Sequence, residues 1–194
     1  MREGDVSRNT LETNINLKTV LEGSGSYSGA TKIGFFDHML ELFTRHSGID
    51  LEIKVEGDLE VDFHHTIEDM GIALGNALKD ALGDKKGIER YGFVYIPMDE
   101  ALVRVCLDLS GRPYLIYNVE FATEKVGDFD CELAEEFIRA LVNNAGITLH
   151  VELLYGRNSH HIVEAVFKGL GQAFKRAARI SDGEGGVPST KGSL

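Results

Sequence analysis

The segment DFHHTIED at residues 62–69 has a partial second copy, HHIVE, at residues 160–164. In each copy two adjacent histidines are followed by a glutamate, four residues after the first histidine. Residues three or four positions apart lie on one face of a helix, so each glutamate would share a face with its histidines. Adjacent imidazoles point about 100° apart around a helix. A single ion is therefore a poor fit for both histidines of a pair, and the repeated segment predicts two metal centres.

The order of elements around the two segments also repeats. Alternating apolar residues predict half-buried strands, and apolar residues three and four apart predict amphipathic helices. The first half is expected to contain strands at residues 11–17 and 51–55, a turn and a short strand around 23–29, and helices at 35–43 and 64–82. The second half is expected to contain strands at 93–98, 101–109, 114–119 and 147–151 and helices at 132–144 and 159–178. The first strand would bury Leu11, Thr13, Ile15 and Leu17 on one face.

Two glycines place the halves in register. Gly48 and Gly146 each precede an alternating strand, and the histidine pairs begin sixteen and fourteen residues after them. An acidic residue lies eleven positions before each glycine, and it is followed by His38 in the first half and by Glu136 in the second. Glu136 is therefore the positional partner of His38.

This duplication predicts an α+β fold of two similar halves, each a small sheet of about four strands with two helices packed on one face. We expect the helices of the two halves to pack together. The first structural repeat is expected to span residues 1–86 and the second residues 87–180, within one globular unit. Residues 181–194 are too polar and glycine-rich for regular structure, and they are expected to form a flexible C-terminal tail that acts as a lid.

Composition excludes several classes of partner. The chain is 43% hydrophobic and 26% charged, as expected of a globular protein, and its formal net charge of −11 argues against nucleic-acid or anionic-membrane surfaces. A small anionic substrate stays possible where a few cations converge. No apolar run resembles a signal peptide or a membrane span, which favours a cytoplasmic protein. Cys106 and Cys131 are isolated in sequence and are expected to be reduced thiols.

Eight side chains form the candidate ligand set and would give four protein ligands to each of two ions. They are His38, His64, His65, Glu68, Glu136, His160, His161 and Glu164. Imidazole and carboxylate ligands without thiolates suit manganese, iron(II) or zinc. Four protein ligands leave vacant positions on a six-coordinate ion, and vacant positions favour a catalytic role over a structural one.

Other interpretations of these histidines stay open. Surface histidines at helix starts can be satisfied by nearby acids, although two copies with a glutamate at the same offset favour ligands. His46, near a predicted helix C-terminus, and His150, alone in a predicted strand, fit structural roles better. The same ligand set would also suit a different dinuclear-metal enzyme, such as a hydrolase that activates water. A non-catalytic metal clamp between subunits is a third possibility.

Five segments in order resemble the imidazoleglycerol-phosphate dehydratase family of histidine biosynthesis. They are FDHML at 36–40, DFHHTIED at 62–69, DLSGRP at 108–113, NSHH at 158–161 and PSTKG at 188–192. The resemblance implies a duplicated fold and a homo-oligomer, a 24-mer built from trimers. It also implies active sites at subunit interfaces with two Mn²⁺ ions each. Many members have histidine where this chain has Glu136.

The resemblance implies a hydro-lyase that eliminates water from D-erythro-imidazole glycerol phosphate to give imidazole acetol phosphate. A proton must leave an unactivated carbon beside the imidazole, and two cations that bind the substrate as imidazolate would stabilise the developing charge. Glu12, in the segment RNTLET at residues 8–13, is the implied catalytic acid/base and contacts the substrate. Taken without the resemblance, Glu12 would be a solvent-facing strand residue.

The substrate phosphate needs converging cations and hydrogen-bond donors. By resemblance these are Arg90, Arg112, Lys168, Ser189 and Lys191. Lys168 follows Glu164 by four residues, so the two are expected to share a helical face. The functional interpretation of the tail is that it becomes ordered over the bound phosphate.

Overall fold

The computed structural model of the chain describes residues 1–181 and 186–190. The first half contains β1 (Glu3–Asn9), β2 (Thr13–Val20), β3 (Tyr27–Ser28), α1 (Gly34–Ser47), β4 (Asp50–Gly57) and α2 (His64–Leu82). The second half contains β5 (Tyr91–Met98), β6 (Ala101–Asp108), β7 (Tyr114–Asn118), β8 (Lys125–Val126), β9 (Phe129–Asp130), α3 (Glu132–Ala145), β10 (Thr148–Tyr155) and α4 (Ser159–Ala178). None of these described helices combines the length and apolar composition that a membrane span requires.

The two four-stranded sheets have the same topology. Their strand orders are β1-β2-β4-β3 and β5-β6-β10-β7. In each sheet a hairpin pairs antiparallel with a later strand, β4 or β10, and a parallel edge strand, β3 or β7, completes the sheet. The predicted α+β fold of two similar halves is therefore confirmed. The predicted division at residues 86 and 87 falls in the connection between α2 and β5 and stays a prediction.

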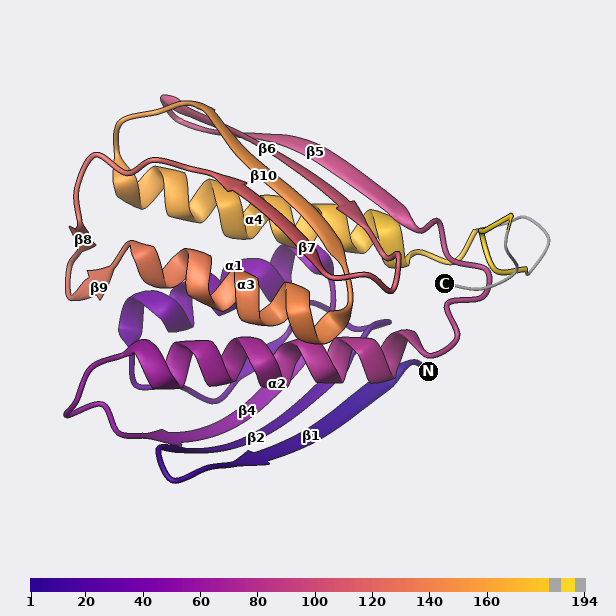
Figure 1. Cartoon of the computed structure of the whole chain (residues 1–194), viewed down its shortest axis with the longest axis horizontal. Helices are drawn as coiled ribbons and strands as arrows, with labels where there is room; N and C mark the ends of the chain where they lie inside the picture. Colours follow the sequence, from indigo (N-terminus) through magenta and orange to yellow (C-terminus); the bar gives the residue numbers. More distant parts are fainter. Residues whose placement is uncertain (182–185, 191–194) are drawn as a thin grey trace.

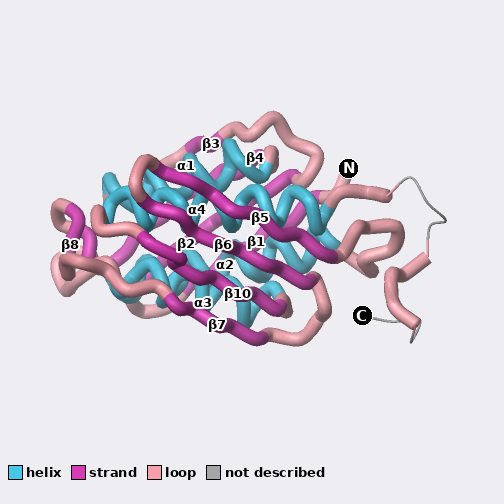
Figure 2. Tube along the Cα trace, turned by 90° about the horizontal axis from the view of Figure 1, so that it is seen from above, coloured by secondary structure: helices cyan, strands magenta, loops and turns pink. Residues whose placement is uncertain are grey.

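The four helices lie between the two sheets, so the molecule has an outer sheet on each side (Figure 1). Figure 2 shows the second sheet covering the helices in the order β5, β6, β10, β7. The helices of the two halves pack together as predicted, α2 on α3 and α1 on α4. The buried ring of Phe137 in α3 stacks on Phe167 of α4 at 5.5 Å and meets Phe36 of α1 edge-on at 5.1 Å. One hydrophobic core thus joins both halves.

A glycine at the same place in each half lets an edge strand lie directly on a helix. A Cβ atom on Gly4 of β1 would lie 2.0 Å from the carbonyl oxygen of Ala77 in α2. A Cβ atom on Gly92 of β5 would lie 1.9 Å from the carbonyl oxygen of Ala173 in α4. Both distances are far shorter than van der Waals contact, so only glycine fits without movement of the backbone.

The N-terminal region differs from the prediction. Leu11 is fully exposed in the turn between β1 and β2, and the strand that was expected to include it begins at Thr13. The sequence also does not predict β1. The inward positions of β1 hold Gly4, Val6 and Arg8, so only one apolar side chain marks its buried face. A strand that packs through glycine and a charged residue gives no apolar alternation.

After α4 the chain returns to the connection between the halves. Ile180 forms a β-bridge with Ile88, and the Ser181 amide donates to the Gly87 carbonyl at 2.7 Å. The Gly87 amide in turn donates to the Gly186 carbonyl at 3.0 Å. Part of the predicted tail is thus bonded to the rest of the chain, whereas residues 182–185 and 191–194 lie outside the described residues. The lid role of the tail stays a prediction.

Candidate metal centre

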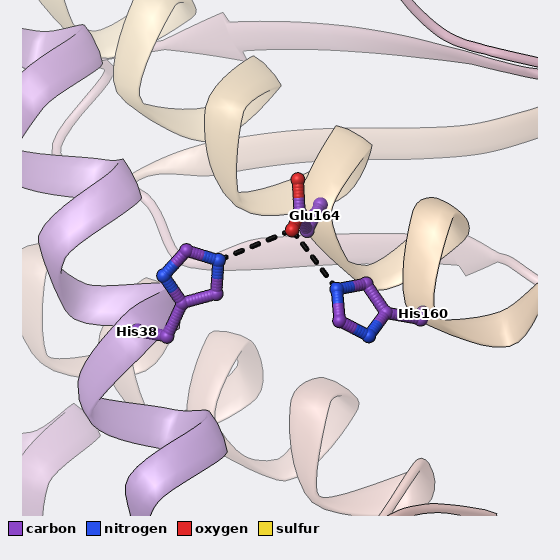
Figure 3. Close-up of side chains that lie close together, drawn as sticks. All are labelled: His38, His160 and Glu164. Atoms are coloured by element: carbon purple, nitrogen blue, oxygen red, sulfur yellow. Dashed lines mark hydrogen bonds and ion pairs between the residues drawn. The ribbon is translucent and has the colours of Figure 1, made fainter.

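Three candidate ligands from two helices converge between the halves. Figure 3 shows His38 of α1 facing His160 and Glu164 of α4. The Nε2 atoms of His38 and His160 lie 3.1 Å and 3.0 Å from the same atom, Oε1 of Glu164. The three ligand atoms lie within 4.8 Å of one another, and no other such group of three converges in the described part of the chain. Two imidazole nitrogens and a carboxylate oxygen, without a thiolate, fit manganese, iron(II) or zinc.

Local sequence explains why these side chains meet. The Asn158 side chain accepts hydrogen bonds from the amide of His160, at 3.0 Å, and from the next amide, so α4 begins directly after this cap. Glu164 lies four residues further and shares the face of His160. Packing of α1 on α4 brings His38 to this face, and the Phe35 ring of α1 contacts the His160 ring at 5.1 Å.

Glu164 is largely buried but ionised. Its side chain is 9% exposed, whereas the side chains of His38 and His160 are 43% and 44% exposed, so the cluster opens to solvent on the histidine side. Burial raises the pKa of the Glu164 carboxyl, but hydrogen bonds from Lys168, His38 and His160 outweigh burial and lower this pKa to about 2. The strongest of them comes from the Lys168 ammonium, 2.6 Å from Oε2. Glu164 therefore has the charge that a cation requires at neutral pH.

The second histidine of each pair has a carboxylate partner on Nδ1. His65 Nδ1 lies 2.9 Å from Asp58 Oδ2, and His161 Nδ1 lies 2.8 Å from Glu100 Oε2. These hydrogen bonds raise the pKa of both histidines, and the bond to His161 lowers the pKa of Glu100 to about 2. A carboxylate that accepts the Nδ1 proton leaves Nε2 free for a metal, which is the usual arrangement around metal-bound histidines. The two halves share this arrangement.

Asp58 and Glu100 are site residues that the sequence interpretation missed. Asp58 directly follows β4, whereas Glu100 lies in the turn between β5 and β6, so they do not occupy corresponding positions. One signal could have found Glu100. It directly precedes β6 just as Glu12 directly precedes β2, so the duplication makes Glu100 the counterpart of Glu12.

The remaining candidate ligands do not converge in the structure. His64 and Glu68 lie at the start of α2, and Glu136 lies near the start of α3. The packing of α2 on α3 repeats the packing of α1 on α4, so by position these three side chains correspond to the three that do converge. Among the described residues they form no convergent ligand group of their own. Their ligation of a metal stays a prediction.

Glu12 lies in the turn between β1 and β2 and not, as expected, within a strand. Its Oε1 atom is 3.7 Å from Nε2 of His65, and its side chain is 52% exposed. The turn thus holds the predicted acid/base beside a candidate ligand and open to solvent. Its catalytic role stays a prediction.

Arg90 lies far from this cluster. Its Nε and Nη2 atoms donate to the Asp108 carboxylate at 2.8 Å and 3.2 Å, and Nη1 donates to the Pro188 carbonyl at 2.8 Å. The Arg90 amide donates to the carbonyl of Ala177, which follows His160 by seventeen residues along α4. At 1.5 Å per residue, Arg90 lies about 25 Å from the histidine end of α4.

The other candidate phosphate ligands are divided between the two ends of the helices. Arg112 is exposed in the turn between β6 and β7, and the adjacent Gly111 lies against Gly146 at the C-terminus of α3. Ser189 belongs to the segment that Arg90 holds through Pro188. Lys168 lies at the histidine end, because its ammonium is paired with Glu164, and the predicted sharing of a helical face is confirmed. Lys191 lies outside the described residues.

The fold and the cluster together define a class, a duplicated α+β protein whose histidine and glutamate side chains converge at one end of its helices. A family model described as imidazoleglycerol-phosphate dehydratase matches residues 31–174, and the chain belongs to this family. The resemblance carried by the five sequence segments is therefore confirmed, and the chain is a hydro-lyase of histidine biosynthesis.

Relatives and solved structures agree with this assignment. The chain is 58% identical to an imidazoleglycerol-phosphate dehydratase of Heliobacterium modesticaldum, with all of both chains covered. It is 44% identical to the crystal structure of that enzyme from Staphylococcus aureus, with a TM-score of 0.83 over 90% of this chain and 97% of the other. The structure from Pyrococcus furiosus, a complex with (S)-C348, is 39% identical, with a TM-score of 0.83 over 97% and 100%.

Proposed function

We propose that the chain eliminates water from imidazole glycerol phosphate to give imidazole acetol phosphate at a site that holds two Mn²⁺ ions. The observation that carries this proposal is the convergence of His38, His160 and Glu164, together with the Nδ1–carboxylate pairs that free Nε2 of His65 and His161. When bound, the two ions would hold the substrate imidazole as imidazolate and stabilise the charge that develops during elimination.

Glu12 is the group best placed to move the proton at the substrate carbon. It lies 3.7 Å from His65, and its half-exposed carboxylate can reach a substrate whose imidazole is held beside that histidine. The hydrogen bond between His65 and Asp58 fixes the ring of His65. The acid/base and the imidazole-binding end of the site would thus be held by one turn and one helix start.

The distance between the two predicted halves of the site supports active sites shared between subunits. Arg90 lies about 25 Å from the histidine end of α4, at 1.5 Å per helical residue. One small substrate cannot place its imidazole at one end and its phosphate at the other end of the same chain. We infer that Arg90, Arg112 and Ser189 of one subunit complete the site of a neighbouring subunit.

The outer face of the second sheet supports such an assembly. Tyr91, Phe93 and Tyr95 of β5 and Tyr114 of β7 are all exposed. Exposed aromatic side chains that gather on one face are typical of protein–protein interfaces. Such a face fits a homo-oligomer, and we propose that the chain forms a 24-mer built from trimers. Analytical ultracentrifugation of the purified protein would test this proposal by measuring the mass of the particle.

The proposed reaction is tested by incubating the assembled protein with imidazole glycerol phosphate and Mn(II), with and without a chelator. Imidazole acetol phosphate should form only with metal, and Glu12→Gln should abolish it while the matched Glu56→Gln variant, on an exposed position of β4, stays active. Absence of metal-dependent product from correctly assembled protein would contradict the proposal. A protein whose only response to chelator is dissociation would support the metal clamp instead.

A further inference from the structure

A charged network around the buried carboxylate of Asp69 joins the turn that carries Glu12, and its Arg8 side chain is 32% exposed. Asp69 and Thr13 are 5% and 4% exposed. Arg8 Nη2 lies 2.7 Å from Oδ1 of Asp69, and the Thr13 hydroxyl donates to Oδ2 at 2.5 Å. Both oxygens of one buried carboxylate are therefore used to join β1, the start of β2 and α2.

Hydrogen bonds continue from this network to the backbone of Glu12. The hydroxyl oxygens of Thr13 and Thr10 lie 3.2 Å apart. The Thr10 hydroxyl accepts hydrogen bonds from the amides of Glu12, at 3.2 Å, and of Thr13, at 2.9 Å. On its other side the Glu12 carbonyl accepts from the amide of Asp58, the partner of His65, at 3.1 Å. The backbone of Glu12 is thus linked to Asp69 through the hydroxyls of Thr10 and Thr13.

In the second half, the positions that correspond to Arg8, Thr13 and Asp69 hold uncharged residues. Thr13 is the first residue of β2, and the first residue of β6 is Ala101. Asp69 directly follows Glu68, and Ala165 directly follows Glu164. Arg8 faces Ile15, the third residue of β2, and Ile96 faces Val103, the third residue of β6.

The corresponding alanines of the second half are fully buried. The shared fold therefore accommodates apolar residues at these positions. Replacing a buried ion pair by well-packed apolar groups is often neutral or stabilising, because desolvation opposes the attraction between the charges. Stability alone does not explain why the first half has an ion pair at these positions.

We propose that Arg8, Thr13 and Asp69 are positioning residues for the proton transfer, because they fix the turn that presents Glu12 to the substrate. This inference rests on the proposed role of Glu12 in the dehydration. The three residues act through the turn and do not touch the substrate. In the second half the corresponding turn carries Glu100 as the partner of His161, and the three corresponding positions hold the apolar residues Ile96, Ala101 and Ala165.

The test replaces the three network residues of the first half by the apolar residues that occupy the corresponding positions in the second half. In the triple variant R8I/T13A/D69A no buried charge is left without a partner, so the protein should fold and assemble. We expect kcat to fall about 100-fold, the effect of displacing a reacting group by roughly 1 Å, with KM unchanged. A triple variant that assembles and keeps the wild-type kcat would overturn the proposal.

A single position gives a second test that does not depend on the triple variant. Thr13→Val keeps the shape of the side chain but removes the hydroxyl, whereas Thr13→Ser keeps the hydroxyl. We expect kcat to fall in the valine variant and to recover in the serine variant. Equal kcat values for the two variants would contradict positioning through the hydroxyl.

Hydrogen exchange supplies a measurement that needs no turnover. In the metal-free triple variant the amides of Glu12 and Thr13 should exchange faster than in the wild type, while the amides in the centre of α2 stay unchanged. If the wild type forms no product, the proposed function fails, and exchange still tests the ordering of the turn. If the wild type is active and exchange in the turn is unaffected, the positioning proposal alone is overturned.

Discussion

The substitution Gly92→Ala tests the contact that holds β5 on α4. The new Cβ atom would lie 1.9 Å from the Ala173 carbonyl oxygen, whereas real Cβ atoms essentially never come closer than 3.0 Å. Strand and helix must therefore separate by about 1 Å, because neither the Cβ atom nor the carbonyl oxygen can rotate out of the contact. Such overpacking costs about 1–3 kcal/mol. Loss of glycine freedom in the unfolded chain offsets about 0.4–1 kcal/mol of this cost.

The net loss of about 1–2 kcal/mol corresponds to a fall in Tm of about 2–8 °C for a chain of this size. Calorimetry at equal protomer concentration should show this fall for Gly92→Ala and for its counterpart Gly4→Ala. Gly34→Ala is the matched control, since nothing lies within 4 Å of the added atom at the start of α1, and its Tm should be unchanged or slightly higher. A wild-type Tm for both strand variants would refute the assigned packing of strand on helix.

Three further outcomes are expected. His38→Ala should weaken Mn²⁺ binding in a titration followed by electron paramagnetic resonance, whereas His46→Ala, at the far end of α1, should not; equal affinities would remove His38 from the ligand set. The pKa of Glu164 is lowered from 4.5 to about 2, so its contribution to stability is present above pH 4.5 and is lost as the pH falls. Urea unfolding of metal-free protein should therefore show a loss of roughly 3 kcal/mol between pH 4.5 and 2 that Glu164→Gln lacks; an identical pH profile would contradict the assigned pKa. Leu11→Ser should leave Tm unchanged while Ile15→Ser lowers it strongly, because only Ile15 is buried.

The duplicated fold could be predicted because its evidence is periodic. Strands such as β4 and β10 alternate apolar and polar residues, and the helices keep apolar residues three and four apart. The strand β1 could not be predicted in this way, since its inward side chains are those of Gly4, Val6 and Arg8. Close backbone packing and an ion pair with a buried carboxylate replace apolar burial there, and neither leaves a pattern in a single sequence.

Part of the candidate site could also be predicted, and the part that could not depends on turns. His160 and Glu164 meet because four residues separate them on one helix, which the sequence states directly. Their contact with His38 requires the packing of α1 on α4, which the sequence supplies only through the correspondence of the two halves. Asp58 and Glu100 come from loops at different positions, so helical spacing identifies neither of them, and the duplication points only to Glu100, as the counterpart of Glu12.

The two halves thus share a fold but differ in charge around the proposed site residues Glu164 and Glu12. Lys168 follows Glu164 by four residues, but the residue that follows Glu68 by four is Ile72, so only one of the two corresponding glutamates has an ammonium partner on its helix. Among the described residues the charged network beneath Glu12 is likewise found in the first half alone. Under the proposed mechanism the substrate needs an acid/base at its carbon and a cation at its phosphate, and the charges that break the duplication, at Lys168 and beneath Glu12, would supply that difference.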